Sequence, residues 1–424
     1  MANNKDIYRT LRTRIFDVID AEALTTLTPA QLQEQLGQAV DLLISQQRLP
    51  LPRLVRNEFV DNLRNELIGL GPIQPLMDDD SITDIMVNGP DHVFIERNGL
   101  VEHSDISFVD EQQVLEIAKR IASRVGRRVD ESVPMCDARL ADGSRVNIVT
   151  EPVAIDGTSI SIRKFKKQKL GLEDMAQNGS MSPQMAQLLA IAARCRLNIV
   201  ISGGTGSGKT TLLNALSHYI STKERIITIE DAAELQLQQP HVVRLETRTA
   251  GIEGSGAIGQ RQLVINSLRM RPDRVIVGEC RGPEAFEMLQ AMNTGHDGSM
   301  TTLHANSPRD AVSRIESMVM MATSSLPLEA IRRTIVSAVD VIIQISRLHD
   351  GSRRLMSISE VVGIEGQSVV LEEIFRFQPD AIQNEGKVVG RYMTSGLMQR
   401  SILVEKARFF GLQDELNQIF GRVT

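Results

Sequence analysis

A glycine-rich segment near the middle of the chain has the residue types and spacing of a phosphate-binding loop. It reads Gly203-Gly204-Thr205-Gly206-Ser207-Gly208-Lys209-Thr210, with Thr211 directly behind it, and it fits the pattern GxxxxGK[ST] in full. Glycines in such a loop let backbone N–H groups close around a phosphate at a helix N-terminus, where the helix dipole favours negative charge. Lys209 would reach the β- and γ-phosphates of a nucleotide, and the Thr210 hydroxyl would bind Mg²⁺.

The surroundings of this segment support the same interpretation. The apolar run 197–202 predicts a buried strand before the loop, and residues 210–220 predict a helix after it. The alternative is a glycine-rich turn between a strand and a helix that binds nothing. Because both the pattern and its context are met, the sequence favours a nucleotide phosphate site.

Polar groups that could assist phosphate hydrolysis follow three other predicted strands. Glu279 comes after the strand 274–277, the acidic cluster 230–234 after the strand 225–229, and His304 after the strand 299–303. Loops at the carboxyl ends of parallel strands line one crevice, so we expect these groups beside the phosphates. A Glu such as Glu279, directly after the strand 274–277, can position and activate water. Taken alone, the acidic cluster is as often a solvated helix cap as a catalytic group. A lone His is usually structural, but at a strand end opposite a P-loop the structural and functional interpretations are equally good.

Two common classes of P-loop protein are disfavoured. A GTPase needs an N/TKxD guanine-reading motif, and the near match Thr222-Lys223-Glu224-Arg225 lacks its Asp. The chain also has no LSGGQ-like run, which weakens an ABC-transporter interpretation.

The elements that must position these groups fall into two patterns. In the second half, strands alternate with helices, which predicts a doubly wound, mainly parallel sheet, and an antiparallel hairpin follows across Asp350-Gly351. In the first half, Thr28-Pro29 predicts a helix start, and Asn88-Gly89 and Asn98-Gly99 predict hairpins within an α/β module. The predicted domains are a helical N-terminal extension (1–70), an N-terminal α/β domain (71–165), a basic linker (166–184), a P-loop domain (185–378) and a C-terminal tail without an assigned role (379–424).

Composition restricts the compartment and the partners. The 424 residues carry a net charge of -6, with three Tyr, eleven Phe and no Trp, so neither a cationic field nor stacking platforms for nucleic acid are abundant. We see no secretory signal and no apolar run near the ~18 residues that a membrane span needs. Cys136, Cys195 and Cys280 are scattered, which disfavours a disulfide framework or zinc site. The sequence therefore predicts a cytoplasmic protein.

Four ordered blocks carry a resemblance to a known family. They are the P-loop, the segment 228–231, the segment 277–281 and the segment 301–306. Together they resemble the Walker A, aspartate, Walker B and histidine boxes of the type II/IV secretion ATPase family. Residues 267–274 and 67–93, with Gly71-Pro72-Ile73, resemble its CpaF-like branch, which includes the ATPase of tight-adherence (Tad) pili.

The resemblance implies a fold and residue roles. It implies an α/β protein with a RecA-like P-loop NTPase domain, a separate PAS-like N-terminal domain and the helical extension. ATP and Mg²⁺ would be bound, with Thr210 and Glu279 at the metal. Glu279 would be the water-activating base, Glu234 with Glu230 and Asp231 would orient water or Mg²⁺, and His304 would lie near the γ-phosphate. Cys280 stands where an aliphatic residue is expected, which leaves the chemistry undisturbed.

The resemblance also implies a homohexamer with nucleotide between the two domains. Arginines there could stabilise transition-state charge, and the candidates are Arg139, Arg145 and Arg163. Arg269, Arg271 and Arg281 would lie closer to the P-loop domain's own sheet. For any one of these arginines, solvation or a structural ion pair is an equally good interpretation.

The function implied is a hexameric motor ATPase that powers pilus assembly or protein secretion. It would be cytoplasmic and peripheral at the inner membrane, bound to platform proteins, with no membrane span and no nucleic-acid partner. The alternative is a P-loop motor that moves nucleic acid, as in conjugation. A nucleotide-sensing scaffold without hydrolysis is disfavoured by the intact set of Lys209, Glu234, Glu279 and His304.

Overall fold

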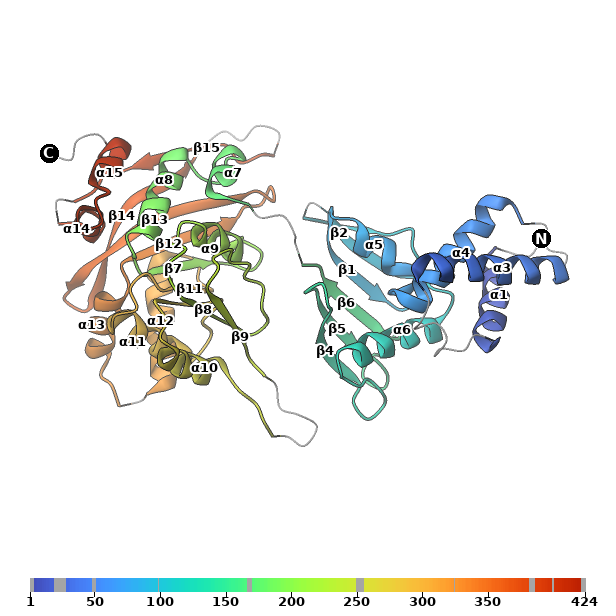
Figure 1. Cartoon of the computed structure of the whole chain (residues 1–424). Helices are drawn as coiled ribbons and strands as arrows, with labels where there is room; N and C mark the ends of the chain where they lie inside the picture. Colours follow the sequence, from blue (N-terminus) through green and yellow to red (C-terminus); the bar gives the residue numbers. More distant parts are fainter. Residues whose placement is uncertain are drawn as a thin grey trace. The chain divides into compact units, whose positions relative to one another are not determined.

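The chain forms two compact units, Met1–Lys167 and Gln168–Thr424, each treated by itself (Figure 1). The computed structural model describes residues 4–18, 28–47, 51–97, 99–165, 170–248, 255–323, 325–380, 386–398 and 400–420. Within these ranges, no helix is both long enough and apolar enough to cross a membrane.

The first unit begins with three helices that share a small apolar core. They are α1 (Asn4–Val18), α3 (Pro29–Gln47) and α4 (Arg53–Ile68). The predicted start of α3 is confirmed: the Thr28 hydroxyl accepts from Gln31 N at 3.3 Å, and Gln31 Oε1 accepts from Thr28 N at 2.9 Å. Helix-spaced residues of all three helices, including Leu11, Leu36 and Leu63, bury one another.

Hydrogen bonds to Glu66 connect these helices to the rest of the unit. Its carboxylate is almost fully buried, and it accepts hydrogen bonds from Arg12 Nε at 2.6 Å and from Gln113 Nε2 at 2.8 Å. Arg12 lies on α1, and Gln113 lies on α6 (Glu111–Arg124), which covers the sheet described next. A buried carboxylate is tolerated only with such partners. The predicted N-terminal extension is therefore packed onto the α/β module.

A six-stranded antiparallel sheet forms the body of the first unit. Its order is β3-β2-β1-β6-β5-β4, and the Asn-Gly hairpins predicted from the sequence are the pairs β1–β2 and β2–β3. Helix α6, the short α5 (Gln74–Asp78) and the 3₁₀ turn Gly71–Ile73 supply residues to its core. The strands are β1 (Ile82–Asn88), β2 (Val93–Arg97), β3 (Leu100–His103), β4 (Met135–Arg139), β5 (Arg145–Val149) and β6 (Ser159–Arg163).

The second unit is built on a nine-stranded sheet of order β15-β14-β13-β12-β7-β11-β10-β8-β9. The run from β12 to β9 is parallel, as predicted, and β13, β14 and β15 join it antiparallel. The predicted hairpin is β12–β13. The strands are β7 (Ile199–Gly203), β8 (Ile226–Glu230), β9 (Val242–Glu246), β10 (Arg274–Val277), β11 (Met300–Leu303), β12 (Val341–Arg347), β13 (Arg353–Glu365), β14 (Ser368–Pro379) and β15 (Gly390–Thr394).

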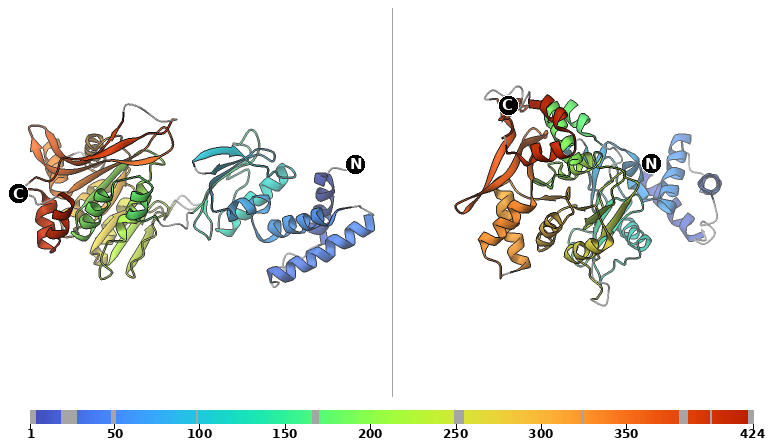
Figure 2. Two further views of the ribbon diagram at one scale, coloured as in Figure 1. Left: turned by 90° about the horizontal axis from the view of Figure 1, so that it is seen from above. Right: turned by 60° about the vertical axis from the view of Figure 1, so that its left-hand side comes forward.

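Helices cover both faces of this sheet (Figure 2). Along β7, Ile199 and Ile201 join one apolar core and Val200 joins the other, because successive side chains of a strand point to opposite faces. The first core is shared with α7 (Leu172–Gln177), α8 (Pro183–Arg194), α9 (Lys209–Ser217), α14 (Ile402–Phe409) and α15 (Gln413–Phe420). The second is shared with α10 (Gln260–Ser267), the 3₁₀ turn Leu268–Met270, α11 (Glu284–Asn293), α12 (Pro308–Ala322) and α13 (Leu328–Ala338).

Two predicted domain limits differ from the structure. Residues 166–169 of the predicted linker lie outside the described residues, but α7 follows, and its Leu172 and Met175 are buried in the core of the second unit. The predicted tail contains β15, α14 and α15, whose Leu403 and Leu416 are buried in the same core. These elements have five to eight residues each. Such short pieces have weak periodicity and are stabilised by packing, so the sequence does not reveal them.

Polar contacts fix α14 to the sheet. Glu360 on β13 is buried, and its Oε1 accepts from Ser401 Oγ at 3.0 Å and from Leu403 N at 3.3 Å, at the start of the helix. Further along α14, Lys406 Nζ lies 3.0 Å from Asp340 Oδ2, just before β12. An anion at a helix N-terminus and a satisfied ion pair both favour this docking.

We predict that Lys406→Met lowers the stability of the second unit by about 2 kcal/mol, because it leaves the largely buried Asp340 carboxylate without its cation. The measurement is the midpoint of thermal unfolding, which should fall on the order of 5 °C. The double variant Lys406→Met/Asp340→Asn should recover much of the loss. Arg333→Met, which removes an exposed pair with Glu329 on α13, is the control and should change little. An unchanged midpoint for Lys406→Met would contradict the docking.

Candidate functional site

The register of the parallel strands brings the predicted site residues to one edge of the sheet. Ile229 of β8 lies beside Val277 of β10, Val277 lies beside Thr301 of β11, and Leu303 lies beside Ser202 of β7. The residues that follow these positions are therefore neighbours across the sheet. The P-loop, the acidic cluster, Glu279 and His304 all begin at this edge, as the sequence predicts.

The glycines of the P-loop are required by its backbone and by its close packing. Gly206 and Gly208 have φ values of 69° and 101°, which side chains disfavour. At Gly203 a Cβ atom would lie 2.3 Å from the carbonyl oxygen of Ile345 on β12, which leaves no space for any other residue. Helix α9 begins immediately at Lys209, and the N–H groups of its first turn have no acceptors within the helix.

Lys209 is folded back onto its own loop. Its Nζ donates to the carbonyl oxygens of Gly203 and Gly204, each at 3.0 Å. Desolvation lowers the pKa of Lys209, and the negative charge of Glu279 opposes that shift. Thr210 and Thr211 are the second and third residues of α9 and are half-buried.

Glu279 lies at the centre of a group of charged side chains. Its Oε2 accepts from Arg281 Nε at 2.7 Å, and its Oε1 lies 2.6 Å from His304 Nε2. Apart from this contact with the imidazole, Oε1 is buried and has no hydrogen-bond partner among the described residues. His304 Nε2 is also 3.5 Å from Lys209 Nζ. One carboxylate oxygen is thus held by Arg281, and the other is available to a water or a metal ion.

The same charges shift the pKa values of the His304 imidazole and of the Arg281 guanidinium. Desolvation and then the charge of Lys209 lower the pKa of His304, while Glu279 acts in the opposite direction. His304 is therefore neutral at pH 7. Desolvation also acts to lower the pKa of Arg281, but the hydrogen bond and the charge of Glu279, with Asp231 and Glu234, outweigh it and raise that pKa.

In the acidic cluster the buried carboxylate is that of Glu230. Its Oε2 accepts from the backbone N–H groups of Glu234 at 2.7 Å and Leu235 at 2.9 Å. Burial raises the pKa of Glu230, and these two N–H donors oppose the shift. Gly278 makes room for it, because a Cβ there would lie 2.8 Å from Glu230 Cγ. Glu234 contributes its backbone N–H and acts electrostatically on Arg281, so its predicted role at water or Mg²⁺ stays a prediction.

The three arginines predicted in the first unit form one row across its sheet. Arg139 pairs with Arg145 across β4 and β5, and Arg145 pairs with Arg163 across β5 and β6. Their strand neighbours Val146 and Ile162 are buried, so the row lies on the face opposite the core of this unit. Arg163 Nε lies 3.1 Å from Asp84 Oδ1. Like charges placed side by side are unfavourable unless an anion compensates them.

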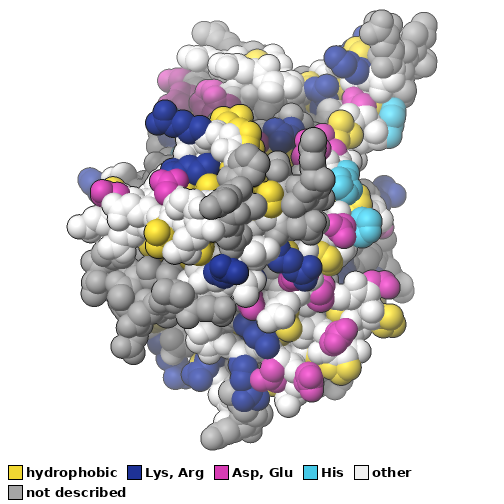
Figure 3. Space-filling model, turned by 90° about the vertical axis from the view of Figure 1, so that its right-hand side faces the viewer, with side chains coloured by type: hydrophobic (Ala, Val, Ile, Leu, Met, Phe, Trp, Pro, Cys, Tyr) yellow, Lys and Arg dark blue, Asp and Glu magenta, His cyan; other side chains and the backbone are white. Residues whose placement is uncertain are grey.

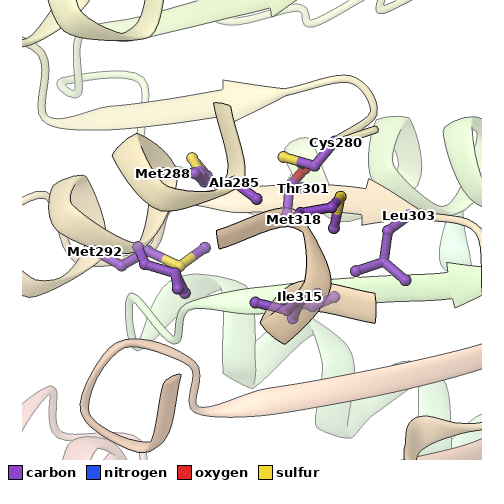
Figure 4. Close-up of a pocket in the computed structure, with 10 residues that line it drawn as sticks. Cys280, Ala285, Met288, Met292, Thr301, Leu303, Ile315 and Met318 are labelled. Atoms are coloured by element: carbon purple, nitrogen blue, oxygen red, sulfur yellow. Dashed lines mark hydrogen bonds between the residues drawn. The ribbon is translucent and has the colours of Figure 1, made fainter. Parts of the chain in front are cut away.

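Beside Cys280, a small apolar pocket lies between β7 and β11 on one side and α11 and α12 on the other (Figure 4). Met288, Met292 and Met318 line it, together with Cys280, whose Sγ is 3.2 Å from Thr301 Oγ1. Burial raises the pKa of Cys280 to about 12, so the thiol stays protonated. Cys280 therefore packs and does not react, in agreement with the sequence analysis.

The residues present fit Mg²⁺ bound together with a phosphate. Among the residues that the structure describes, no cluster of three or more His, Cys, Asp and Glu side chains could form a metal cage. Mg²⁺ does not need one, since it commonly uses one or two protein groups and the oxygens of substrate phosphates. Glu279 Oε1, buried and without a hydrogen-bond partner in the described chain, is suited to such a role.

Sequence reasoning missed one cationic group at this site. Arg353, at the start of β13, donates from Nε to the carbonyl oxygen of Gly206 at 2.9 Å. Arg347, at the end of β12, lies close to the same glycine. The only available signal was that two arginines flank the predicted hairpin turn, and that alone did not connect them to the P-loop.

Comparison with known proteins identifies the family of this chain. The model of the family "Type II/IV secretion system protein" matches residues 66–393. The chain belongs to this family. It is 40% identical over 319 residues to a Mycobacterium tuberculosis protein named provisionally as a conjugal transfer protein, with 73% of this chain and 90% of that protein covered. It is 35% identical over 316 residues to the type IV secretion system protein VirB11 of Brucella suis, with 68% and 88% covered.

A solved ATPase structure shares the fold. The X-ray structure of the Yersinia pseudotuberculosis ATPase DotB matches with a TM-score of 0.50 and 15% identity, and it covers 80% of this chain and 81% of DotB. The predicted fold class, an α/β protein with a RecA-like P-loop domain and a separate N-terminal α/β domain, is confirmed.

We predict that two substitutions in this member of the secretion family shift the pKa of His304 in opposite directions. Lys209→Met removes a positive charge that lowers the pKa, so the pKa should rise. Glu279→Gln removes a negative charge that raises it, so the pKa should fall. Titration of the imidazole signals by NMR measures both shifts, with His304→Gln to assign the signal among seven histidines. Shifts of the same sign in the two variants would refute the arrangement.

Proposed function

We propose that this protein is an ATP hydrolase whose turnover drives a secretion or pilus-assembly machine. One observation carries the proposal: Glu279 has a buried oxygen without a hydrogen-bond partner in the described residues, in the same charged group as the P-loop lysine. A carboxylate held at one oxygen and open at the other suits the activation of water. Membership in the secretion family supports the same reaction.

Each residue of the site then has a role in hydrolysis. The backbone N–H groups of residues 203–211 bind the phosphates of ATP, and Lys209 exchanges its loop carbonyls for phosphate oxygens. Thr210 and Glu279 would hold Mg²⁺, which would supply positive charge against the phosphates. Glu279 accepts a proton from the attacking water, while Arg281 keeps its carboxylate in place. The neutral His304 ring can exchange a hydrogen bond near the γ-phosphate without adding a further positive charge beside Lys209.

We further infer that the active form is a homohexamer peripheral at the cytoplasmic face of the inner membrane. Its partners would be the platform proteins of a Tad-type pilus, and the chain would belong to the CpaF-like branch. The arginine row Arg139–Arg145–Arg163 would stabilise charge on the phosphates in the transition state. The relative VirB11, named as a type IV secretion system protein, and the sequence resemblance support this inference.

We predict that Glu279→Gln lowers ATP turnover by about 10²-fold or more, because the amide cannot accept the proton from water. Phosphate release under saturating ATP and Mg²⁺ measures this loss. Lys209→Ala should also abolish turnover, but through the loss of phosphate binding.

The control for this prediction is Glu329→Gln, an exposed glutamate on α13, which should keep the wild-type rate. Binding of ADP should persist in Glu279→Gln and fall in Lys209→Ala. Phosphate release by Glu279→Gln at the wild-type rate would overturn the assignment of the base.

We also predict that the protein forms hexamers that respond to nucleotide. Light scattering at micromolar protein, with and without ATP and Mg²⁺, measures the mass of the assembly. A strict monomer in the presence of ATP would refute this part of the proposal.

A motor that moves nucleic acid is the second candidate. The name of the mycobacterial relative, which refers to conjugal transfer, favours it. The net charge of -6 and the 3% of aromatic residues argue against it. On the face drawn in Figure 3, the described Lys and Arg side chains are interspersed with Asp and Glu. ATP turnover that rises several-fold on addition of DNA would favour this candidate over the first.

A further inference from the structure

The hairpin β12–β13 extends along the P-loop within the same chain. Strand β12 runs parallel to β7, and Ile345 pairs with Gly203, the first residue of the loop. The strand then continues to Arg347, which pairs with Arg353 at the start of β13. Both arginines are thus placed beside the loop by the register of the sheet, although they lie well over 100 positions further along the chain.

Both arginine side chains reach glycines of the loop. Arg353 Nε donates to the carbonyl oxygen of Gly206 at 2.9 Å, and its Cδ would lie 3.4 Å from a Cβ at Gly208. Arg347 NH1 would lie 3.7 Å from a Cβ at Gly206. Both side chains remain exposed in the second unit. The two arginines therefore border the loop at Gly206 and Gly208, whereas Lys209 contacts the carbonyls of Gly203 and Gly204.

Several hydrogen bonds stabilise the turn between the two arginines. Asp350 Oδ1 accepts from Ser352 N at 2.9 Å and from Ser352 Oγ at 2.6 Å, and Leu348 N donates to Ser352 O at 2.8 Å. The other oxygen of Asp350 accepts from Val388 N at 2.8 Å. A turn fixed in this way holds the strand ends, and with them the two cations, in position.

We propose that this hairpin is part of the nucleotide site, with Arg353 as a positioning residue for the P-loop and both arginines adding positive charge beside the polyphosphate. A guanidinium on the carbonyl of Gly206 keeps that carbonyl turned outward, which leaves the loop N–H groups for the phosphates. Like charges on directly paired residues repel each other, so an anion beside both is favoured. Guanidinium groups are well suited to phosphate oxygens. The inference rests on the proposed function, because it assumes that the loop binds ATP and ADP.

The test compares ADP and adenosine binding by the full-length protein, with fluorescent ADP as the probe and unlabelled adenosine as competitor. Arg353→Met should weaken ADP binding about tenfold, which corresponds to about 1.4 kcal/mol. Arg347→Met should weaken it several-fold. Arg353→Lys should restore part of the affinity, since it keeps the charge. Adenosine binding should change in none of them, because adenosine carries no phosphate.

The salt dependence separates an electrostatic role from a merely structural one. Raising the ionic strength should weaken ADP binding by the wild type more than by Arg347→Met or Arg353→Met. In steady-state hydrolysis, the variants should raise the KM for ATP more than they lower kcat. Arg333→Met, on α13, is the matched arginine control and should behave as the wild type.

Two results would overturn the inference. The first is wild-type ADP affinity in both arginine variants while the wild type itself binds and hydrolyses ATP. The second is an equal loss of ADP and adenosine binding, which would mean that the hairpin only supports the fold. The proposed function fails differently: the wild type would release no phosphate, or Glu279→Gln would turn over normally, whatever the arginine variants show.

Discussion

The in-register parallel pairing of β8, β10, β11 and β7 is the constraint on which the site depends. None of the groups that surround Glu279 is near it in the chain except Arg281. They meet because the four strands are parallel, so that the loop after each strand begins at the same edge of the sheet. A shift of one residue in any pair would also turn the side chains of that strand to the opposite apolar core. The two cores that hold the register therefore hold the site as well.

The opposite edge of the sheet secures this register with buried polar contacts. Arg274, at the start of β10, is fully buried and binds Glu224 through two nitrogens at 2.6 and 3.0 Å. Its NH1 also donates to the carbonyl oxygen of Gly298, just before β11. The backbone N–H of Asn198, before β7, donates to Asp340 Oδ2 at 2.8 Å, and the same oxygen accepts from Lys406 of α14. Buried polar contacts thus hold the amino ends of the strands, at the edge of the sheet opposite the site.

Short sequence patterns predict those parts of the fold that depend on residues close together in the chain. The P-loop, the strand–helix alternation and the Asn-Gly hairpins each lie within a few residues, and the structure confirms them. Arg139, Arg145 and Arg163 could be chosen by residue type, but only the pairing of β4, β5 and β6 shows that they form a row. Arg353 could not be placed, because its partner Gly206 is 147 positions away. The role of Glu234 stays a prediction, and the sequence does not reveal that Glu230 is the buried carboxylate of the acidic cluster, packed against Gly278.

The cationic side chains at the site contact neutral carbonyl oxygens, and a phosphate can take the place of these contacts. Lys209 and Arg353 donate to three carbonyl oxygens of the P-loop, at Gly203, Gly204 and Gly206. Neutral carbonyls compensate a cation less well than an anion does, and desolvation lowers the pKa of Lys209 in spite of these bonds and of Glu279. A polyphosphate would supply the missing negative charge without moving the backbone that carries the N–H donors. The loop is thereby already shaped for its ligand, and binding mainly requires that the cationic side chains change partners.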